Sequence, residues 1–126
     1  MARRTSPALT DAEARVMHVL WSLKTGTVAD VVDGMTTNKS TPSYSTVQTM
    51  LRILETKGYV AHEKAGRAFA YRPLIDQTQA RRRALSHLVS GLFDNSPSLL
   101  VLNVLEDERI DRRELDRLRQ LIMESE

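Results

Sequence analysis

The sequence predicts a mainly α-helical protein with a small β-hairpin, arranged as a winged helix-turn-helix followed by a helical dimerisation domain. Three short helical patterns come first, and the outer face of the third carries hydroxyl, amide and guanidinium groups. A hairpin pattern follows, and three further apolar helical patterns close the chain. We therefore expect a first domain at residues 1–74 and a second at 75–126.

Length and composition set the broad class. The chain has 126 residues, of which 41% are hydrophobic and 27% are charged, as is usual for a soluble globular protein. No apolar run approaches the length of about 20 residues that a membrane span needs, and no signal-peptide pattern opens the chain. The absence of cysteine excludes disulfides, thiolate metal sites and cysteine nucleophiles. We expect a cytoplasmic protein without membrane insertion, cofactor or bound metal.

Charge is uneven along the chain. Residues 1–74 hold ten lysines and arginines against six acidic residues, a net charge of +4, whereas residues 75–126 hold eight against ten, a net charge of −2. A basic first part is suited to a polyanion such as DNA, and the second part to a different partner.

Two short helices are expected near the start of the chain. Thr10 and Glu13 have the spacing of a capping box, in which each side chain accepts from the other residue's amide. A buried stripe follows, made by Val16, Val19, Leu20 and Leu23, with Met17 and Trp21 beside it. Thr27 is placed to cap the second helix, whose apolar residues are Val28, Val31, Val32 and Met35.

The third helix, at 43–58, organises the rest of the chain. Ser43 is a good N-cap, and Gly58 suits the left-handed position that ends a helix. Its buried stripe is Val47, Met50, Leu51 and Leu54. Its opposite face holds Ser45, Gln48, Thr49, Arg52 and Thr56. Groups of these kinds hydrogen-bond base edges and phosphates, and the last of three such helices is the one that enters the major groove.

The hairpin pattern forms the predicted wing. Two strand-like runs at 59–64 and 67–72 flank Ala65 and Gly66. Lys64 and Arg67 fall near the tip, with His62 as a further candidate, where cations are able to reach phosphates.

The second half predicts three helices. Ser96 caps the middle one, with Pro97 at its first position, and the apolar run 98–105 should be buried on most sides. Three helices of this size are too few to cover so much apolar surface comfortably alone, so we expect a symmetric partner chain. The alternative is that this surface packs onto the winged helix of the same chain. The dimerisation residues are Leu85, Leu88, Leu92, Phe93, Leu99, Leu102, Leu105, Leu115, Leu118, Leu121 and Ile122.

Several stretches resemble the penicillinase-repressor family, the BlaI/MecI-type regulators, which also includes copper-responsive members. They are LTDAEARVMHVLW at 9–21, YSTVQTML at 44–51, KG at 57–58, GRAFAY at 66–71, LFDNS at 92–96 and LVLNVL at 100–105. The resemblance covers nearly the whole chain and implies a homodimeric transcriptional repressor. It implies DNA contacts at Ser43, Ser45, Thr46, Thr49 and Arg52, supported by Arg67. Tyr44 and Gln48 complete the predicted face, and Lys57 and Lys64 add phosphate-binding cations.

The resemblance also bears on regulation. In the penicillinase members, a membrane sensor-protease pathway leads to cleavage inside the dimerisation domain, and the matching segment here is Asn103-Val104. A bulkier aromatic residue often follows that asparagine in those members. Copper-responsive members carry cysteine ligands, which this chain lacks, so direct thiolate copper sensing is excluded. Ile53 and Thr56 stand where cations are frequent in the family, which predicts fewer phosphate contacts.

The predicted function is repression by a homodimer bound to a dyad-symmetric double-stranded DNA operator, with a β-lactam-resistance-type or related stress operon as the target class. Two alternatives are a winged helix used only for protein–protein contact and a small-molecule-responsive regulator. An enzyme is not expected, because the chain has no glycine-rich phosphate loop and its three histidines lack ligand spacing. Residues 81–83, three arginines, are expected to form a solvated helix face, with contact to the DNA backbone as the alternative.

Overall fold

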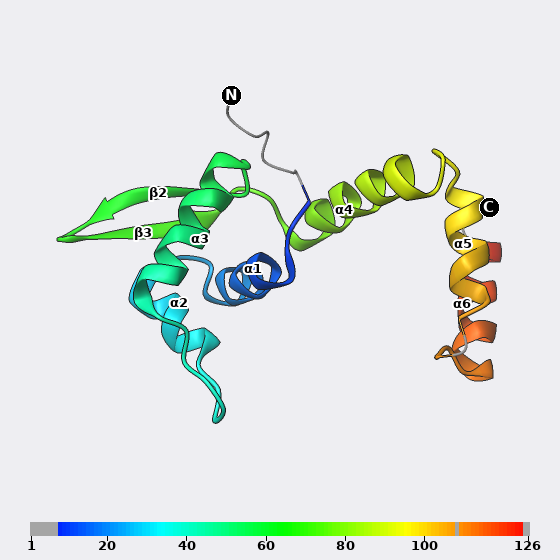
Figure 1. Cartoon of the computed structure of the whole chain (residues 1–126), viewed down its shortest axis with the longest axis horizontal. Helices are drawn as coiled ribbons and strands as arrows, with labels where there is room; N and C mark the ends of the chain where they lie inside the picture. The colour runs from blue at the N-terminus through cyan, green and yellow to red at the C-terminus, as the bar shows by residue number, and fades with distance from the viewer. Residues whose placement is uncertain (1–7, 108, 125–126) are drawn as a thin grey trace. The chain divides into compact units, whose positions relative to one another are not determined.

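The computed structural model describes residues 8–107 and 109–124. The chain divides into two compact units, of which the first ends at Leu85 and the second begins at Ser86. The helix α4, Gln77–Leu92, runs across this boundary (Figure 1). The mainly α-helical class with a small antiparallel sheet is confirmed.

The first unit is a winged helix. Its elements are α1 (Asp11–Leu23), β1 (Gly26–Thr27), α2 (Val28–Met35), α3 (Tyr44–Thr56), β2 (Val60–Ala65) and β3 (Ala68–Pro73), followed by the start of α4. The strands form an antiparallel sheet in the order β1-β3-β2. Figure 1 shows the β2–β3 hairpin extending from the three helices as the wing.

The strand β1 pairs Gly26 with Tyr71 and Thr27 with Ala70, and it was not predicted from the sequence. A strand of two residues has no alternation to detect, and its partner lies far along the chain. The hairpin turn was predicted correctly. Gly66 has a φ of 65°, as the first central position of a type II′ turn requires.

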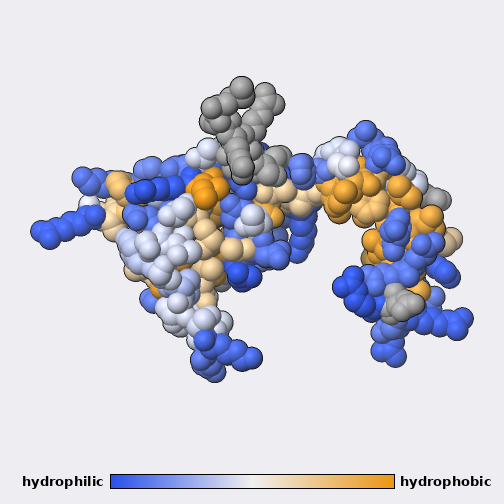
Figure 2. All heavy atoms as spheres, viewed as in Figure 1, coloured by the Kyte–Doolittle hydropathy of each residue, from blue (hydrophilic) through white to orange (hydrophobic). Residues whose placement is uncertain are grey.

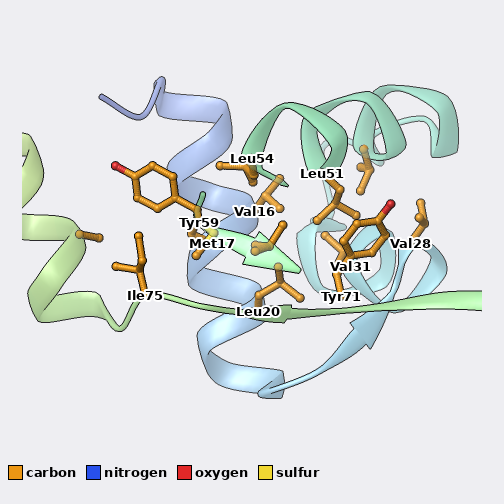
Figure 3. Packing of buried hydrophobic residues seen from close by; sticks show 13 residues of the cluster. Val16, Met17, Leu20, Val28, Val31, Leu51, Leu54, Tyr59, Tyr71 and Ile75 are labelled. Carbon is orange, nitrogen blue, oxygen red and sulfur yellow. The ribbon is translucent and has the colours of Figure 1, made fainter. Parts of the chain in front are cut away.

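The predicted helical stripes meet in one core (Figure 3). Val16, Met17 and Leu20 of α1 are fully buried, whereas Leu23 at the end of the predicted stripe is 43% exposed. The other core residues are Val28, Val31, Val47, Leu51, Leu54, Tyr59, Val60, Tyr71, Ile75 and Ala80. Ile75 and Ala80 therefore anchor the start of α4 in the winged-helix core.

Local hydrogen bonds fix the helix ends. The capping box of α1 is present: the Thr10 amide donates to Glu13 Oε1 at 2.8 Å and the Glu13 amide to Thr10 Oγ1 at 3.1 Å. Thr27 and Asp30 form a second capping box on α2. Gly58 ends α3 with a φ of 84°, a conformation that glycine adopts at little cost.

The second unit holds the end of α4, α5 (Pro97–Leu105) and α6 (Arg112–Glu124). Ser96 caps α5 as predicted, accepting a hydrogen bond from the Leu99 amide. The expected burial of α5 is not found within one chain, since no described residue of α5 or α6 is buried. Figure 2 shows hydrophobic residues gathered at the surface of α5 and the end of α4.

None of the described helices is long and apolar enough by itself to cross a membrane, and α4 and α5 meet that criterion only as a pair bent by 96°.

Candidate nucleic-acid interface

The outer face of α3 is open to solvent. Tyr44 at its start is 55% exposed. Gln48 is half-buried beside the apolar stripe. The remaining predicted contact residues of this helix are all exposed, namely Ser43, Ser45, Thr46, Thr49 and Arg52. These side chains are brought together on one surface because they lie opposite the stripe that packs into the core.

Internal hydrogen bonds determine which donor and acceptor groups of these hydroxyls remain available to an outside partner. Ser43 Oγ accepts from the Thr46 amide and donates to Thr46 Oγ1 at 2.7 Å. Thr49 Oγ1 donates to the Ser45 carbonyl at 2.9 Å. Ser43 and Thr49 therefore present acceptor lone pairs, whereas Thr46 keeps its own hydroxyl proton for an outside acceptor.

The hairpin places two cations at the wing tip. Lys64 is at the end of β2, opposite Phe69, and Arg67 lies in the turn. Both are exposed. Within the described part of the chain, Lys64, Arg67 and Arg52 form no ion pair, so their charges are not neutralised by a neighbouring carboxylate.

Lys57 requires a correction. It was predicted to contact phosphate, but its Nζ lies 2.7 Å from Glu13 Oε1, and its side chain is 4% exposed. Nζ also donates to the Ala8 carbonyl at 2.9 Å. An ammonium group buried in this way is occupied inside the protein, so Lys57 is a structural residue of the winged helix. Its position just after α3 could not indicate whether it turned inward or outward.

A link between α3 and the wing was also not predicted from the sequence. Glu55, the only carboxylate within α3, lies 2.6 Å from His62 Nδ1 and accepts from the His62 amide at 3.2 Å. His62 therefore lies at the base of the wing, in edge contact with Phe69. The same carboxylate acts on Tyr71: burial, and then Glu55, raise the pKa of this phenol, while Arg52 opposes them. Glu55 is thus directed toward the wing.

The predicted dimerisation residues form the open apolar surface of the later helices. Leu85, Leu88 and Leu92 of α4 are exposed, the last by 76%. Phe93, Leu105, Leu115 and Leu118 are half-buried. The others are also exposed, namely Leu99, Leu102, Leu121 and Ile122. Asn103 and Val104, the predicted cleavage segment, lie in α5 and are exposed.

No group of three or more histidine, aspartate or glutamate side chains in the described residues is arranged to hold a metal ion. Of the three histidines, His62 is engaged with Glu55 and His18 packs edge-on against Trp21.

Comparison with known proteins places this chain in a family. The model of the penicillinase repressor family matches residues 9–124. The chain belongs to the penicillinase repressor family. The resemblance seen in the sequence is therefore confirmed, and membership of a family of repressors agrees with the expectation that the chain is not an enzyme.

Individual members of the family align with almost the whole length of this chain. The penicillinase repressor of Bacillus licheniformis is 32% identical over 118 residues, which is 94% of this chain and 91% of that protein. The methicillin resistance regulatory protein MecI of Staphylococcus aureus is 23% identical, over 90% of this chain and 92% of that protein. Among solved structures, the DNA-binding domain of the repressor BlaI is 37% identical with a TM-score of 0.51, covering 62% of this chain and 93% of that domain.

Proposed function

We propose that this member of the penicillinase repressor family is a transcriptional repressor that binds double-stranded DNA through the outer face of α3. The observation that carries the proposal is the composition of that face. Exposed hydroxyls, an amide and the Arg52 guanidinium share it, and this guanidinium pairs with no carboxylate that the structure describes. The only carboxylate of α3, Glu55, lies against His62. A carboxylate directed into the DNA-facing solvent would repel phosphates; the Glu55 carboxylate instead lies against the wing, 2.6 Å from His62 Nδ1. The similar BlaI structure is itself a DNA-binding domain.

Binding would have two parts. Arg52, Lys64 and Arg67 supply attraction to phosphates, which makes the logarithm of the binding constant fall with the logarithm of salt by about 0.9 for each phosphate neutralised. Base edges are then read from α3 by Tyr44, Ser45, Thr46, Gln48 and the guanidinium of Arg52, with Ser43 and Thr49 as acceptors. A good bidentate pair discriminates between bases by about 1–3 kcal/mol.

Dimerisation through residues 75–126 would double the interface. The exposed leucines of α4, α5 and α6 are more apolar surface than a stable monomer usually leaves open. A symmetric second copy covers such a surface with the same residues from both chains. Two winged helices related by a two-fold axis predict an operator with dyad symmetry. Residues 1–74 would then bind DNA and residues 75–126 would hold the dimer together.

Release would follow from loss of the dimer. The segment Asn103-Val104 lies in α5, and its cleavage would separate α6 and part of the apolar surface from the rest. An upstream membrane sensor-protease pathway is the proposed source of cleavage, in the cytoplasm. Because the side chain of Asn103 donates to the Leu99 carbonyl at 2.9 Å within the helix, a protease would have to unwind the end of α5 first. A β-lactam-resistance-type or related stress operon is the proposed target.

Selection from a randomised DNA duplex pool at near-physiological salt tests the proposal. The expected result is one motif recovered in two copies with dyad symmetry. Retention of DNA without enrichment would mean that the protein binds DNA without reading sequence. No retention even at low salt would favour a winged helix that contacts only protein. A chain carrying both Arg52→Ala and Arg67→Ala provides the background of retention that does not use the proposed face.

A further inference from the structure

A groove of about 360 Å³ lies between α1 and the first part of α4, wholly within the first unit. One wall is a stripe of α1, formed by Ala14, His18 and Trp21, with Leu9 preceding it. Leu9 and Trp21 also pack against the edge of the core, whereas His18 is exposed. The other wall is a stripe of α4, formed by Gln77, Ala80, Arg81 and Ala84.

Small side chains keep the groove open. Ala14, Ala80 and Ala84 lie where larger residues would fill the space between the helices. The aromatic wall is fixed in place, because Trp21 Nε1 donates to the Ile75 carbonyl at 2.9 Å. The ring of His18 packs against the indole with centroids 5.3 Å apart and planes at 82°. The groove therefore has an aromatic wall whose orientation is fixed by hydrogen bonding and ring packing, and the methyl groups of three alanines form part of its lining.

The charge at the groove is positive. Arg81 is exposed and forms no ion pair with any residue that the structure describes. No carboxylate is among the lining residues within the described ranges 8–107 and 109–124. The nearby acid Asp76 uses its Oδ1 to accept from the Gln79 amide, and Arg83 lies over the Tyr59 ring instead. One free guanidinium thus borders an otherwise apolar and aromatic space.

We propose that this groove binds a small aromatic carboxylate, with its ring against Trp21 and its carboxylate on Arg81. A volume of about 360 Å³ is near the lower end of small-molecule sites, which suits one ring or two fused rings. Offset or edge-on aromatic contact favours a planar ring beside the indole. A guanidinium recognises a carboxylate with two parallel hydrogen bonds. This site does not involve the DNA-binding face and is independent of the function proposed above.

Nuclear magnetic resonance on the full chain tests the site directly. The chain has one tryptophan, so a ¹⁵N-labelled sample gives one indole N–H signal, and that signal belongs to the groove. Benzoate should move it in a saturable manner. Benzamide, a neutral analogue of the same shape, should bind about tenfold or more weakly, because it lacks the charge that Arg81 recognises. Cyclohexanecarboxylate, with the charge but no aromatic ring, should also bind more weakly.

Three variants locate the ligand. Arg81→Gln should weaken benzoate binding about tenfold or more and leave benzamide unchanged. Arg82→Gln, which removes the neighbouring charge outside the groove, should bind benzoate like the unmodified chain. Ala84→Leu should fill the groove and abolish the shift, while the rest of the spectrum shows that the fold persists. The absence of a saturable shift with benzoate would overturn the proposal. So would equal effects of Arg81→Gln and Arg82→Gln, or unchanged binding by Ala84→Leu.

Discussion

Lys57 Nζ lies 2.7 Å from Glu13 Oε1, and the two side chains are only 4% and 5% exposed. The pair joins the residue that follows α3 to the first turn of α1. The same Glu13 oxygen accepts from the Thr10 amide, and the same Nζ donates to the Ala8 carbonyl. These bonds hold the end of α3 against the start of α1, so they set the orientation of the proposed DNA-reading helix.

Breaking one side of this pair should cost stability. Lys57→Met leaves the Glu13 carboxylate buried without its partner, which typically costs about 3–5 kcal/mol. Replacing both residues in Glu13→Leu/Lys57→Met leaves no unpaired charge and should cost much less than the single change. Urea denaturation followed by circular dichroism measures both. A loss below about 1 kcal/mol for Lys57→Met, in the range of an exposed pair, would show that the pair is solvated.

The same pair predicts a pH dependence. Burial raises the pKa of Glu13, but hydrogen bonds from Lys57 and Thr10 outweigh it, so the pKa lies below its usual value of 4.5. The unfolded chain therefore binds this proton more readily than the folded chain. The stabilisation is complete above the unfolded pKa and is lost as pH falls through the lowered folded pKa.

Denaturation at a series of pH values checks this sign. The unfolding free energy of the unmodified chain should exceed that of Glu13→Gln at neutral pH, and the gap should narrow below about pH 4.5. Because the other carboxylates are common to both chains, the difference isolates Glu13. A gap that stays constant or widens in acid would contradict the assignment.

The helices α1 and α2 approach closely at Gly34. The effect of Gly34→Ala on stability should therefore change sign when Val19 is replaced by a smaller residue. A Cβ at Gly34 would lie 2.5 Å from Val19 Cγ1. Val19 is β-branched and has little freedom to move aside. Gly34→Ala should therefore destabilise by about 1–2 kcal/mol, although alanine is the better helix former. In a Val19→Ala background the clash is gone, and Gly34→Ala should instead stabilise by up to about 1 kcal/mol. Destabilisation of equal size in both backgrounds would show that contact with Val19 is not the cause.

Much of the fold was predictable because local signals agree with it. The capping box of Thr10, the stripe of α3 from Val47 to Leu54 and the glycine at 66 each specify their own element. The two-residue strand β1 was not predictable, because its pairing with β3 depends on contacts made only in the folded chain. Nor did periodicity reveal that Ile75 and Ala80 pack into the first core.

Some features of the candidate site were likewise predictable from the sequence, and others were not. The outer stripe of α3 follows from helical spacing, which placed Ser45, Thr49 and Arg52 on one side of the helix, and all three are exposed. Whether a cation is free or paired depends on a neighbour distant in sequence. Lys57 was misjudged because Glu13 is its partner, and the pairing of His62 with Glu55 was missed for the same reason.

Dimerisation can be tested at an apolar residue that is more than half exposed in the single chain. Leu102 is 52% exposed on α5. Leu102→Asp puts a charge into the proposed interface and should convert a dimer into a folded monomer, because an unpaired buried charge is strongly unfavourable. Sedimentation velocity at micromolar concentration gives the mass, with Asn103→Asp as a control of equal charge one residue away. A monomeric mass for the unmodified chain, or a dimer for Leu102→Asp, would refute the proposed interface.

The most direct test of the DNA-binding face is titration of the selected duplex at a series of salt concentrations. The unmodified chain is compared with Arg52→Ala, Arg67→Ala and the second-unit control Arg109→Ala. Arg52→Ala should lower affinity and alter base preference. Arg67→Ala should reduce the salt slope by about 0.9 and leave base preference intact, because a phosphate contact carries no sequence information. If both variants bind the duplex as the control does, with the same slope and preference, then α3 and the wing are not the DNA-binding face.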